Sequence, residues 1–273
     1  MAGDVEAEVQ YFGSAPEKPT FHAQDHRRDN WTPDTHRMMF HDARRWPTAP
    51  TLEREGIALV PHKTAIKDFS TPSITGAAYR RELEELVQGV TGASRVVAYS
   101  SGHMRYSQRH ESYKSGQNSQ PAHFPHVDCT ENTSAGLVER QFFHSKKEDL
   151  KPGQRLIGYN IWRVVSEPPH DQPLAVCDGG SVARSDLVYA DGVYDYTEPP
   201  WMRSEAFLVK HNPNHRWIYF SDMRPDEALI FRTFASSDGA IGIPHVAFLD
   251  PTCPQSATGR VSVEAHVYAI FDA

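Results

Sequence analysis

The stretch IPHVAFLDPTCPQSATGRVSVEAHVYAIF, residues 243–271, contains two runs rich in β-branched and aromatic residues, separated by a cluster of Pro, Asp, Ser and Gly. Runs of this kind between turn-forming residues are typical of β-strands. Similar runs precede them in the second half of the chain. Many short strands with one flanking helix predict an all-β jelly roll or sandwich rather than a parallel α/β sheet. The predicted strands are residues 155–165, 205–211, 216–222, 228–234, 243–249 and 260–271.

The first half of the chain contains the clearest helix pattern. In residues 79–92, apolar residues recur at the spacing of one helix face, and Gly92 is suited to end the helix. We expect a strand directly after this helix, over residues 94–100, and another before it, beginning within residues 56–66. A second, short helix is expected over residues 133–143.

The length of the chain fits one large domain, so we expect a single domain over residues 1–273. Residues 1–55 are rich in Pro, His, Asp and Arg and show little periodicity, which predicts an irregular N-terminal arm. The core then covers residues 56–273. The aromatic-rich segment 190–205 lacks strand periodicity, and we interpret it as a loop of the kind that covers a binding site.

Composition and charge exclude several classes of function. The net charge is −7 and the Lys and Arg residues are scattered, so we expect no nucleic-acid partner. No apolar run approaches the roughly 18 residues of a membrane span, and the acidic start lacks the apolar core of a secretion signal. Cys129, Cys177 and Cys253 form no paired motif, which indicates a cytoplasmic protein with structural cysteines. The expected partner is a small-molecule substrate, and the oligomeric state is left open.

The segment HFPHVDCT, residues 123–130, places His126 and Asp128 one residue apart. In an extended segment alternate side chains point the same way, so both residues could face one metal ion. Jelly-roll oxygenases bind non-haem iron through two histidines and one carboxylate on one face of the metal. The candidate for the second histidine is His245, on a later predicted strand. We therefore predict that His126, Asp128 and His245 bind the metal and form the catalytic centre.

A possible anion clamp follows in the motif GRVSVE, where Arg260 and Ser262 share one face of a predicted strand. A guanidinium matches a carboxylate with two parallel hydrogen bonds, and a serine hydroxyl adds another donor. This pair could hold the distal carboxylate of 2-oxoglutarate. The motif alone is a weak signal, because a surface arginine is its ordinary interpretation. Its place downstream of the histidine and aspartate candidates strengthens the prediction.

Two further polar residues, Asn160 and Arg163, lie in the predicted strand 155–165. Their positions differ by an odd number, so only one of them can point inward from a regular strand. Both are candidates for co-substrate binding, and an outward salt bridge is the alternative for Arg163. Three other late histidines are interpreted as structural or exposed rather than as metal ligands: His211, His215 and His266.

Six blocks of sequence follow one another along the chain: HVDCT, NIWRVV, PLAVCD, NPNHRWIYFSDMRPDEALIF, PHVAFLDPTCP and GRVSVE. Through these blocks the chain resembles the gibberellin-desaturase-like (AsaB/CmcJ-type) family of oxygenases, from about residue 56 to the C-terminus. This family occurs in fungal and bacterial natural-product pathways. The segment 100–120 keeps His103 and Arg105 of the family pattern but not their surroundings, which concerns the substrate rather than the metal chemistry.

The resemblance implies a cupin-like double-stranded β-helix that uses Fe(II), 2-oxoglutarate and O2. His126, Asp128 and His245 would then be the iron ligands, and Arg260 with Ser262 would hold the co-substrate. The implied reaction is hydroxylation, desaturation or oxidative cyclisation of a small metabolite in secondary metabolism. Asp128 argues against a halogenase, which needs the carboxylate position vacant for chloride. The alternative is a jelly-roll metalloenzyme that acts without 2-oxoglutarate, such as a cupin-type dioxygenase or isomerase.

Overall fold

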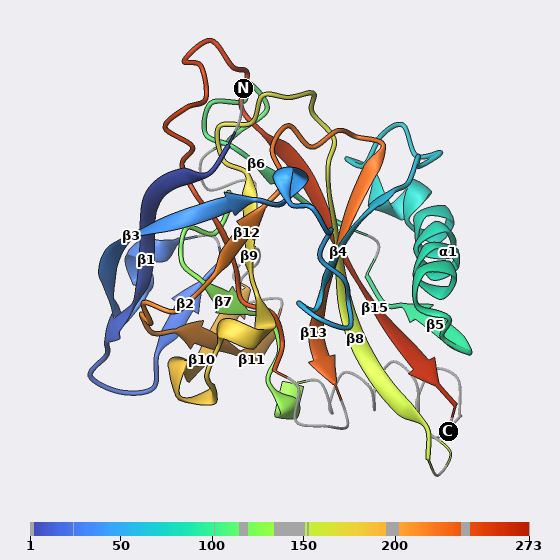
Figure 1. The fold of residues 1–273 in the computed structure, drawn as a ribbon, viewed down its shortest axis with the longest axis horizontal. Coiled ribbons are helices and arrows are strands. Elements are labelled where there is room, and N and C mark those ends of the chain that lie inside the picture. Colours follow the sequence, from blue (N-terminus) through green and yellow to red (C-terminus); the bar gives the residue numbers. More distant parts are fainter. Residues whose placement is uncertain are drawn as a thin grey trace.

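The structure, a computed structural model, describes residues 3–23, 25–100, 102–114, 120–133, 151, 153–194, 202–235 and 241–272. The strands of this part of the chain form two curled β-sheets, and α1 (Pro72–Thr91) lies to one side of them (Figure 1). Four short 3-10 helices are also present in this part of the chain: η1 (His26–Arg28), η2 (Ala43–Arg45), η4 (Gly179–Ser181) and η5 (Arg184–Asp186).

The larger sheet is assembled from segments far apart in the sequence. Its strands run in the spatial order β1, β3, β12, β9, β14, β7, β11, β10, β2. Neighbours that are distant in sequence therefore lie side by side, which is how a jelly roll brings remote residues to one place. The strands are β1 (Val5–Ser14), β2 (Thr20–His22), β3 (Thr32–Asp42), β7 (His126–Val127), β9 (Leu174–Cys177), β10 (Leu187–Tyr194), β11 (Met202–Val209), β12 (Trp217–Tyr219) and β14 (His245–Ala247).

The smaller sheet has the spatial order β4, β13, β8, β15, β5, and β6 also pairs with β15. β15 is central, because it pairs with β8 on one side and with β6 and β5 on the other. These strands are β4 (Ile57–Pro61), β5 (Arg95–Ala98), β6 (His103–Tyr106), β8 (Arg155–Val164), β13 (Glu227–Ala235) and β15 (Val261–Phe271).

An apolar core fills the space between the two sheets. Trp162 and Phe231 of the smaller sheet pack in one buried cluster with Val176 and Ile218 of the larger sheet. Burial of such side chains stabilises the fold by roughly 1.5–3 kcal/mol each. The same interior face also receives His126 and His245, so the polar site lies at one part of an otherwise apolar interior.

α1 covers the opposite face of the smaller sheet (Figure 1). Its residues Tyr79, Leu83 and Val87 are buried in a cluster with strand residues of β8, β13 and β15. The helix ends as predicted, since Gly92 adopts a left-handed conformation with φ 68° and donates its N–H to Gln88. It begins earlier than predicted, at Pro72, a residue suited to a first helical turn. No helix in the described residues is long and apolar enough to cross a membrane.

The prediction of an irregular arm over residues 1–55 is wrong. β1 and β3 form a long antiparallel pair in which Val5 is opposite Phe40. Val9 and Tyr11 of β1 are fully buried in the core cluster of the larger sheet, while Gln10 between them is exposed. The alternation VEAEVQY was present in the sequence, but the polar composition around it concealed the strand.

Most predicted strands in the second half are confirmed, with shifts of a few residues at their ends. β9 and β10 were missed, because β9 is a run of only four apolar residues and β10 mixes Asp and Gly with tyrosines. The described residues of the segment 190–205 are strand rather than loop, because β10 pairs with β11 from Leu187↔Val209 to Tyr194↔Met202. Residues 195–201 of the predicted loop lie outside the described part. Most of the predicted helix over residues 133–143 also lies outside it.

Candidate metal and co-substrate site

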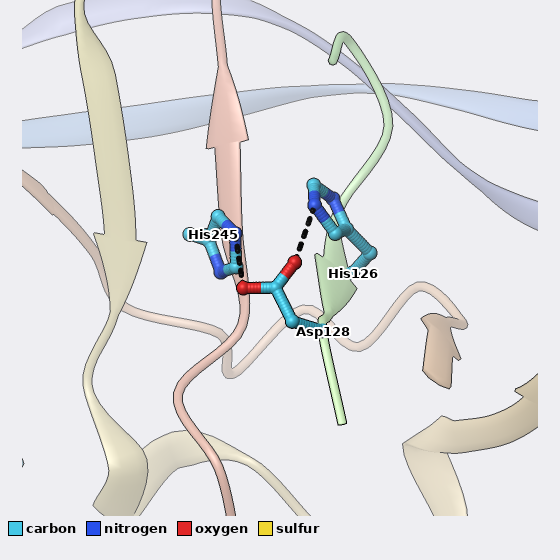
Figure 2. Close-up of side chains that lie close together, drawn as sticks. All are labelled: His126, Asp128 and His245. Atoms are coloured by element: carbon cyan, nitrogen blue, oxygen red, sulfur yellow. Dashed lines mark ion pairs between the residues drawn. The ribbon is translucent and has the colours of Figure 1, made fainter. Parts of the chain in front are cut away.

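The two predicted histidine ligands meet because β7 and β14 are neighbouring strands. His126 and His245 are direct partners in the antiparallel register, and their ring centroids are 4.3 Å apart. Asp128 follows β7 and points between the two imidazoles (Figure 2). Its carboxylate oxygens lie 3.5 Å from Nε2 of His126 and 3.6 Å from Nε2 of His245. The structure thus brings all three predicted ligands to one point.

Backbone hydrogen bonds set the orientation of both imidazoles. Nδ1 of His126 lies 3.0 Å from the carbonyl oxygen of Phe124, and Nδ1 of His245 lies 3.3 Å from that of Ile243. A carbonyl only accepts, so each Nδ1 carries the proton and each Nε2 keeps its lone pair. Burial lowers the pKa of His245 to about 4, which leaves this imidazole neutral at neutral pH.

Asp128 supplies a negative charge among these neutral nitrogens. Burial alone would raise its pKa, but the surrounding histidines, His245 foremost, hold the pKa well below its ordinary value. Nε2 of His245 is buried and has no hydrogen-bond partner within the described residues. Two imidazole lone pairs and one carboxylate match the donor set of a non-haem Fe(II) centre with open positions. The residues therefore fit a metal ion.

Arg260 and Ser262 form a second buried polar group nearby. Both are almost completely buried, and Nε and Nη1 of Arg260 and the hydroxyl of Ser262 have no partner among the described residues. Burial lowers the pKa of Arg260 to about 9, so the guanidinium stays charged at neutral pH. An unpaired buried charge is costly, and an anion bound here would offset that cost. Asp171 holds the backbone in place by accepting the N–H of Arg260 at 2.9 Å.

A small cavity links the two groups. Its volume is about 20 Å³, and it is lined by His126 and His245 at the metal cluster and by Arg260 beyond them. Such a volume holds about one water molecule. Side chains would therefore have to move for a five-carbon diacid to enter. Arg105, which also lines this cavity and is 21% exposed, is the charged side chain at its rim.

A wider groove of about 670 Å³ lies elsewhere, between β1, β3 and the segment that precedes β7. It reaches Phe124, whose ring lies 5.3 Å from the ring of His126. None of the predicted site residues lines this groove. We therefore assign the chemistry to the smaller cavity, where the unpartnered polar atoms are, and not to the more spacious groove.

The prediction that only one of Asn160 and Arg163 points inward is correct, and the inward residue is Asn160. Its amide nitrogen lies 2.6 Å from Asp128. Arg163 is buried on the side of α1, where it donates to the hydroxyl of Tyr79 at 3.1 Å and to the backbone oxygen of His62. The prediction that Arg163 binds the co-substrate is therefore corrected: its strand parity directs it to the helix.

Sequence reasoning missed two residues of the site, Glu264 and His266. Nε2 of His266 lies 3.7 Å from Asp128, and Glu264 and His266 form with Asp128 a second group of possible metal ligands. His266, interpreted from the sequence as structural or exposed, is partly buried beside Asp128. The signal was available, since Ser262, Glu264 and His266 alternate along β15 with Arg260 just before it.

Two curled sheets around a centre of two histidines and one carboxylate define a jelly-roll metalloenzyme. The family model described as oxidoreductase/YMDC permease-like domain matches residues 9–270. The Fe(II)/2-oxoglutarate-dependent dioxygenase nvfI of Aspergillus novofumigatus is 31% identical over 247 residues, or 86% of this chain and 82% of the relative. The hydroxylase/desaturase CTB9 of Cercospora beticola is 29% identical, over 81% of this chain and 72% of the relative. The chain belongs to this oxidoreductase family.

A solved structure supports the fold independently. The iron and α-ketoglutarate-dependent endoperoxidase NvfI superposes with a TM-score of 0.80 and 24% sequence identity, over 99% of each chain. The predicted double-stranded β-helix is confirmed by this likeness. The family resemblance and the expectation of an oxidoreductase that depends on Fe(II) and 2-oxoglutarate are confirmed at the level of the family.

Proposed function

We propose that the chain is a non-haem Fe(II)/2-oxoglutarate-dependent oxygenase. In this proposal His126, Asp128 and His245 hold the iron, and Arg260 with Ser262 holds the distal carboxylate of 2-oxoglutarate. One observation carries the proposal: His245 and Arg260 line a single cavity, and each has buried nitrogens without a partner among the described residues, Nε2 of His245 suited to a cation and Nε and Nη1 of Arg260 suited to an anion. A dicarboxylate that also chelates the metal would satisfy both sets.

The chain's own residues orient the reactants and exclude water. When bound, the iron would couple the oxidative decarboxylation of 2-oxoglutarate to the oxidation of a substrate C–H bond by O2. Arg260 fixes the co-substrate by a charge-assisted fork, and Trp162 packs beside that guanidinium, 5.2 Å from its central carbon to the ring centroid. The apolar walls around these groups strengthen the electrostatic contacts within.

The substrate class is a small molecule of secondary metabolism, hydroxylated, desaturated or oxidatively cyclised. The names of two relatives, a hydroxylase/desaturase and an endoperoxidase, support an oxidation at carbon without choosing among these outcomes. We further propose a cytoplasmic location. The three buried cysteines support it because they form no disulfide among the described residues, and thiols stay reduced in the cytoplasm.

The alternative, a jelly-roll metalloenzyme that acts without 2-oxoglutarate, leaves Arg260 without a function. A buried guanidinium with two unpartnered N–H groups would then cost stability without a ligand to offset it. The small volume of the cavity bears equally on both functions, because any ligand larger than a water molecule requires the lining side chains to move.

The test is the formation of succinate from 2-oxoglutarate by the Fe(II)-loaded protein, with and without a panel of small natural-product intermediates. We expect succinate in the wild-type protein and none in Asp128→Ala. Arg260→Ala should need more 2-oxoglutarate than the wild-type protein to form succinate at the same rate. Its matched control is Arg216→Ala, which removes a partly exposed arginine on the surface. Succinate formation by Asp128→Ala at the wild-type rate would refute the proposal.

A further inference from the structure

Asn160 lies between two buried carboxylates. Its Nδ2 donates to Oδ2 of Asp128 at 2.6 Å and to Oε1 of Glu264 at 2.8 Å. An amide NH2 group has two hydrogens, so these two bonds use both of them. The side chain reaches this position from β8, where Asn160 is paired with His266 of β15, and it is completely buried.

The orientation of this amide is determined by the carboxylates. Oδ1 of Asn160 is buried and has no partner among the described residues. Rotation of the amide would place that oxygen against Asp128 and Glu264, where acceptor would face acceptor. In the observed orientation the N–H groups of Asn160 therefore lie between the carboxylates of Asp128 and Glu264, while its carbonyl oxygen has no partner among the described residues.

Glu264 is itself fixed from the other side. Its Oε2 lies 3.3 Å from Nε of Arg105, and its Oε1 lies 3.8 Å from Nε2 of His266. Burial and the neighbouring Asp128 would raise the pKa of Glu264, but Arg105 and His266 hold the pKa below its ordinary value. The contacts thus form a chain from Arg105 through Glu264 and Asn160 to Asp128, across three strands of the smaller sheet to the segment after β7.

We propose that Asn160 is a positioning residue: its hydrogen bond to Oδ2 fixes the Asp128 carboxylate in the orientation that places Oδ1 beside His126 and Oδ2 beside His245, and Glu264 anchors the amide. This inference rests on the proposed function. Its consequence is a carboxylate that cannot turn away from the two imidazoles, so that His126, Asp128 and His245 would be held ready to bind a metal ion together.

A second metal ion is the competing interpretation of the same residues. One ligand atom from each of Asp128, Glu264 and His266 lies within 4.8 Å of the others. An ion between Asp128 and Glu264 would, however, meet the N–H groups of Asn160, which repel a cation. The structure therefore favours the amide, not a cation, as the group that balances these two carboxylates.

The experiment is a titration of the metal-free protein with Co(II), followed by calorimetry and by the visible spectrum of the bound ion. Partners of metal ligands typically contribute 10–100-fold to metal affinity. Asn160→Leu should therefore bind Co(II) about 10–100-fold more weakly than wild type and with an altered spectrum. The matched control is Asn212→Leu, which removes an amide donor 3.0 Å from another buried carboxylate, Asp186, and should leave Co(II) binding unchanged.

Two further variants make the result specific. Asn160→Leu/Glu264→Gln returns an amide donor to the neighbourhood of Asp128, so it should regain part of the lost affinity, which a general packing defect would not. If Asn160→Leu does not fold, Asn160→Ser decides instead, because its single hydroxyl hydrogen can serve one carboxylate and should give a smaller loss.

The outcomes separate this inference from the proposed function. Wild-type affinity and spectrum in the Asn160 variants, with binding lost in Asp128→Ala, would overturn the positioning role and leave the proposed function intact. Unchanged Co(II) binding in Asp128→Ala would overturn the metal-ligand assignment itself. Two Co(II) ions per wild-type chain, the second lost in Glu264→Gln, would replace the positioning role by a second metal site.

Discussion

A single side chain, Arg260, separates an oxygenase that uses 2-oxoglutarate from a simpler metal-binding jelly roll. The metal triad alone would serve many kinds of chemistry. In the proposed function the buried guanidinium of Arg260, whose Nε and Nη1 have no partner among the described residues, takes up an anion beside the metal.

Cys177, in contrast, has no chemical role at the same scale. Burial raises the pKa of its thiol to about 12, which keeps the thiol protonated and unreactive.

We predict that Arg260→Ala weakens 2-oxoglutarate binding by about one to two orders of magnitude. A charge-assisted contact is worth roughly 1.5–3 kcal/mol, and about 1.4 kcal/mol corresponds to a factor of ten. Arg260→Lys should be intermediate because it keeps the charge and loses the fork. Ser262→Ala should have a smaller effect. Calorimetric titration of the iron-loaded protein under nitrogen measures this, and unchanged affinity in folded Arg260→Ala would contradict it.

We also predict that replacing all three cysteines, Cys129, Cys177 and Cys253, by Ala leaves succinate formation measurable. All three are buried and form no disulfide among the described residues, and none belongs to the metal or anion group. The variant should be less stable than wild type, because buried volume is removed at three positions. Loss of all turnover in a folded, iron-loaded variant would show that a thiol takes part in the reaction.

At the scale of elements, strand parity is what positions the site. The alternation along β15 brings Ser262, Glu264 and His266 to the interior, and the same rule sends Asn160 inward and Arg163 to α1. The grouping of His126, Asp128 and His245 could be predicted from sequence because it has a recognisable spacing, whereas the roles of this group and of Arg260 with Ser262 stay predictions. The network around Asp128 could not, because its hydrogen bonds depend on which strands become neighbours, and β8 and β15 are about a hundred residues apart.

The N-terminal strands offer an element-scale prediction. The hydroxyl of Tyr11 on β1 accepts the indole N–H of Trp217 at 2.7 Å in the buried core. Tyr11→Phe would leave that N–H without its acceptor and should lower the free energy of unfolding by about 1–3 kcal/mol. Tyr189→Phe, at an exposed tyrosine, should change it by less than about 0.5 kcal/mol. Equal effects in urea denaturation would argue against a structural role for β1.

At the scale of the whole molecule, the fold class followed from strand composition, whereas the N-terminal sheet strands did not. β3 reads as a turn-like sequence, TPDTHRMMFHD, and only pairing with β1 makes it a strand. Tertiary pairing thus overrides the weak local preference of Pro, Asp and His. The same long-range pairing of β7 with β14 creates the metal site from residues 126 and 245.

Buried histidines predict a pH dependence for the metal-free protein. Burial lowers the pKa of His103 and of His245 to about 4, below the ordinary value of 6.5. The unfolded chain therefore binds more protons than the folded chain between pH 6.5 and about 4, so stability falls as the pH falls through this window. His266, whose pKa is raised, opposes this change in part. Denaturation at pH 7 and at pH 5 measures the effect, and higher stability at pH 5 would contradict it. The pKa is also lowered at five other histidines: His62, His123, His170, His211 and His215.

The most direct measurement is the stoichiometry of anaerobically bound Fe(II), together with the visible charge-transfer band that forms when 2-oxoglutarate chelates the bound iron. We predict one Fe(II) per wild-type chain and a band that appears on addition of 2-oxoglutarate. We predict that His126→Ala and His245→Ala lose both signals while the protein remains folded. Full iron content and an unaltered band in either variant would contradict the proposed metal centre.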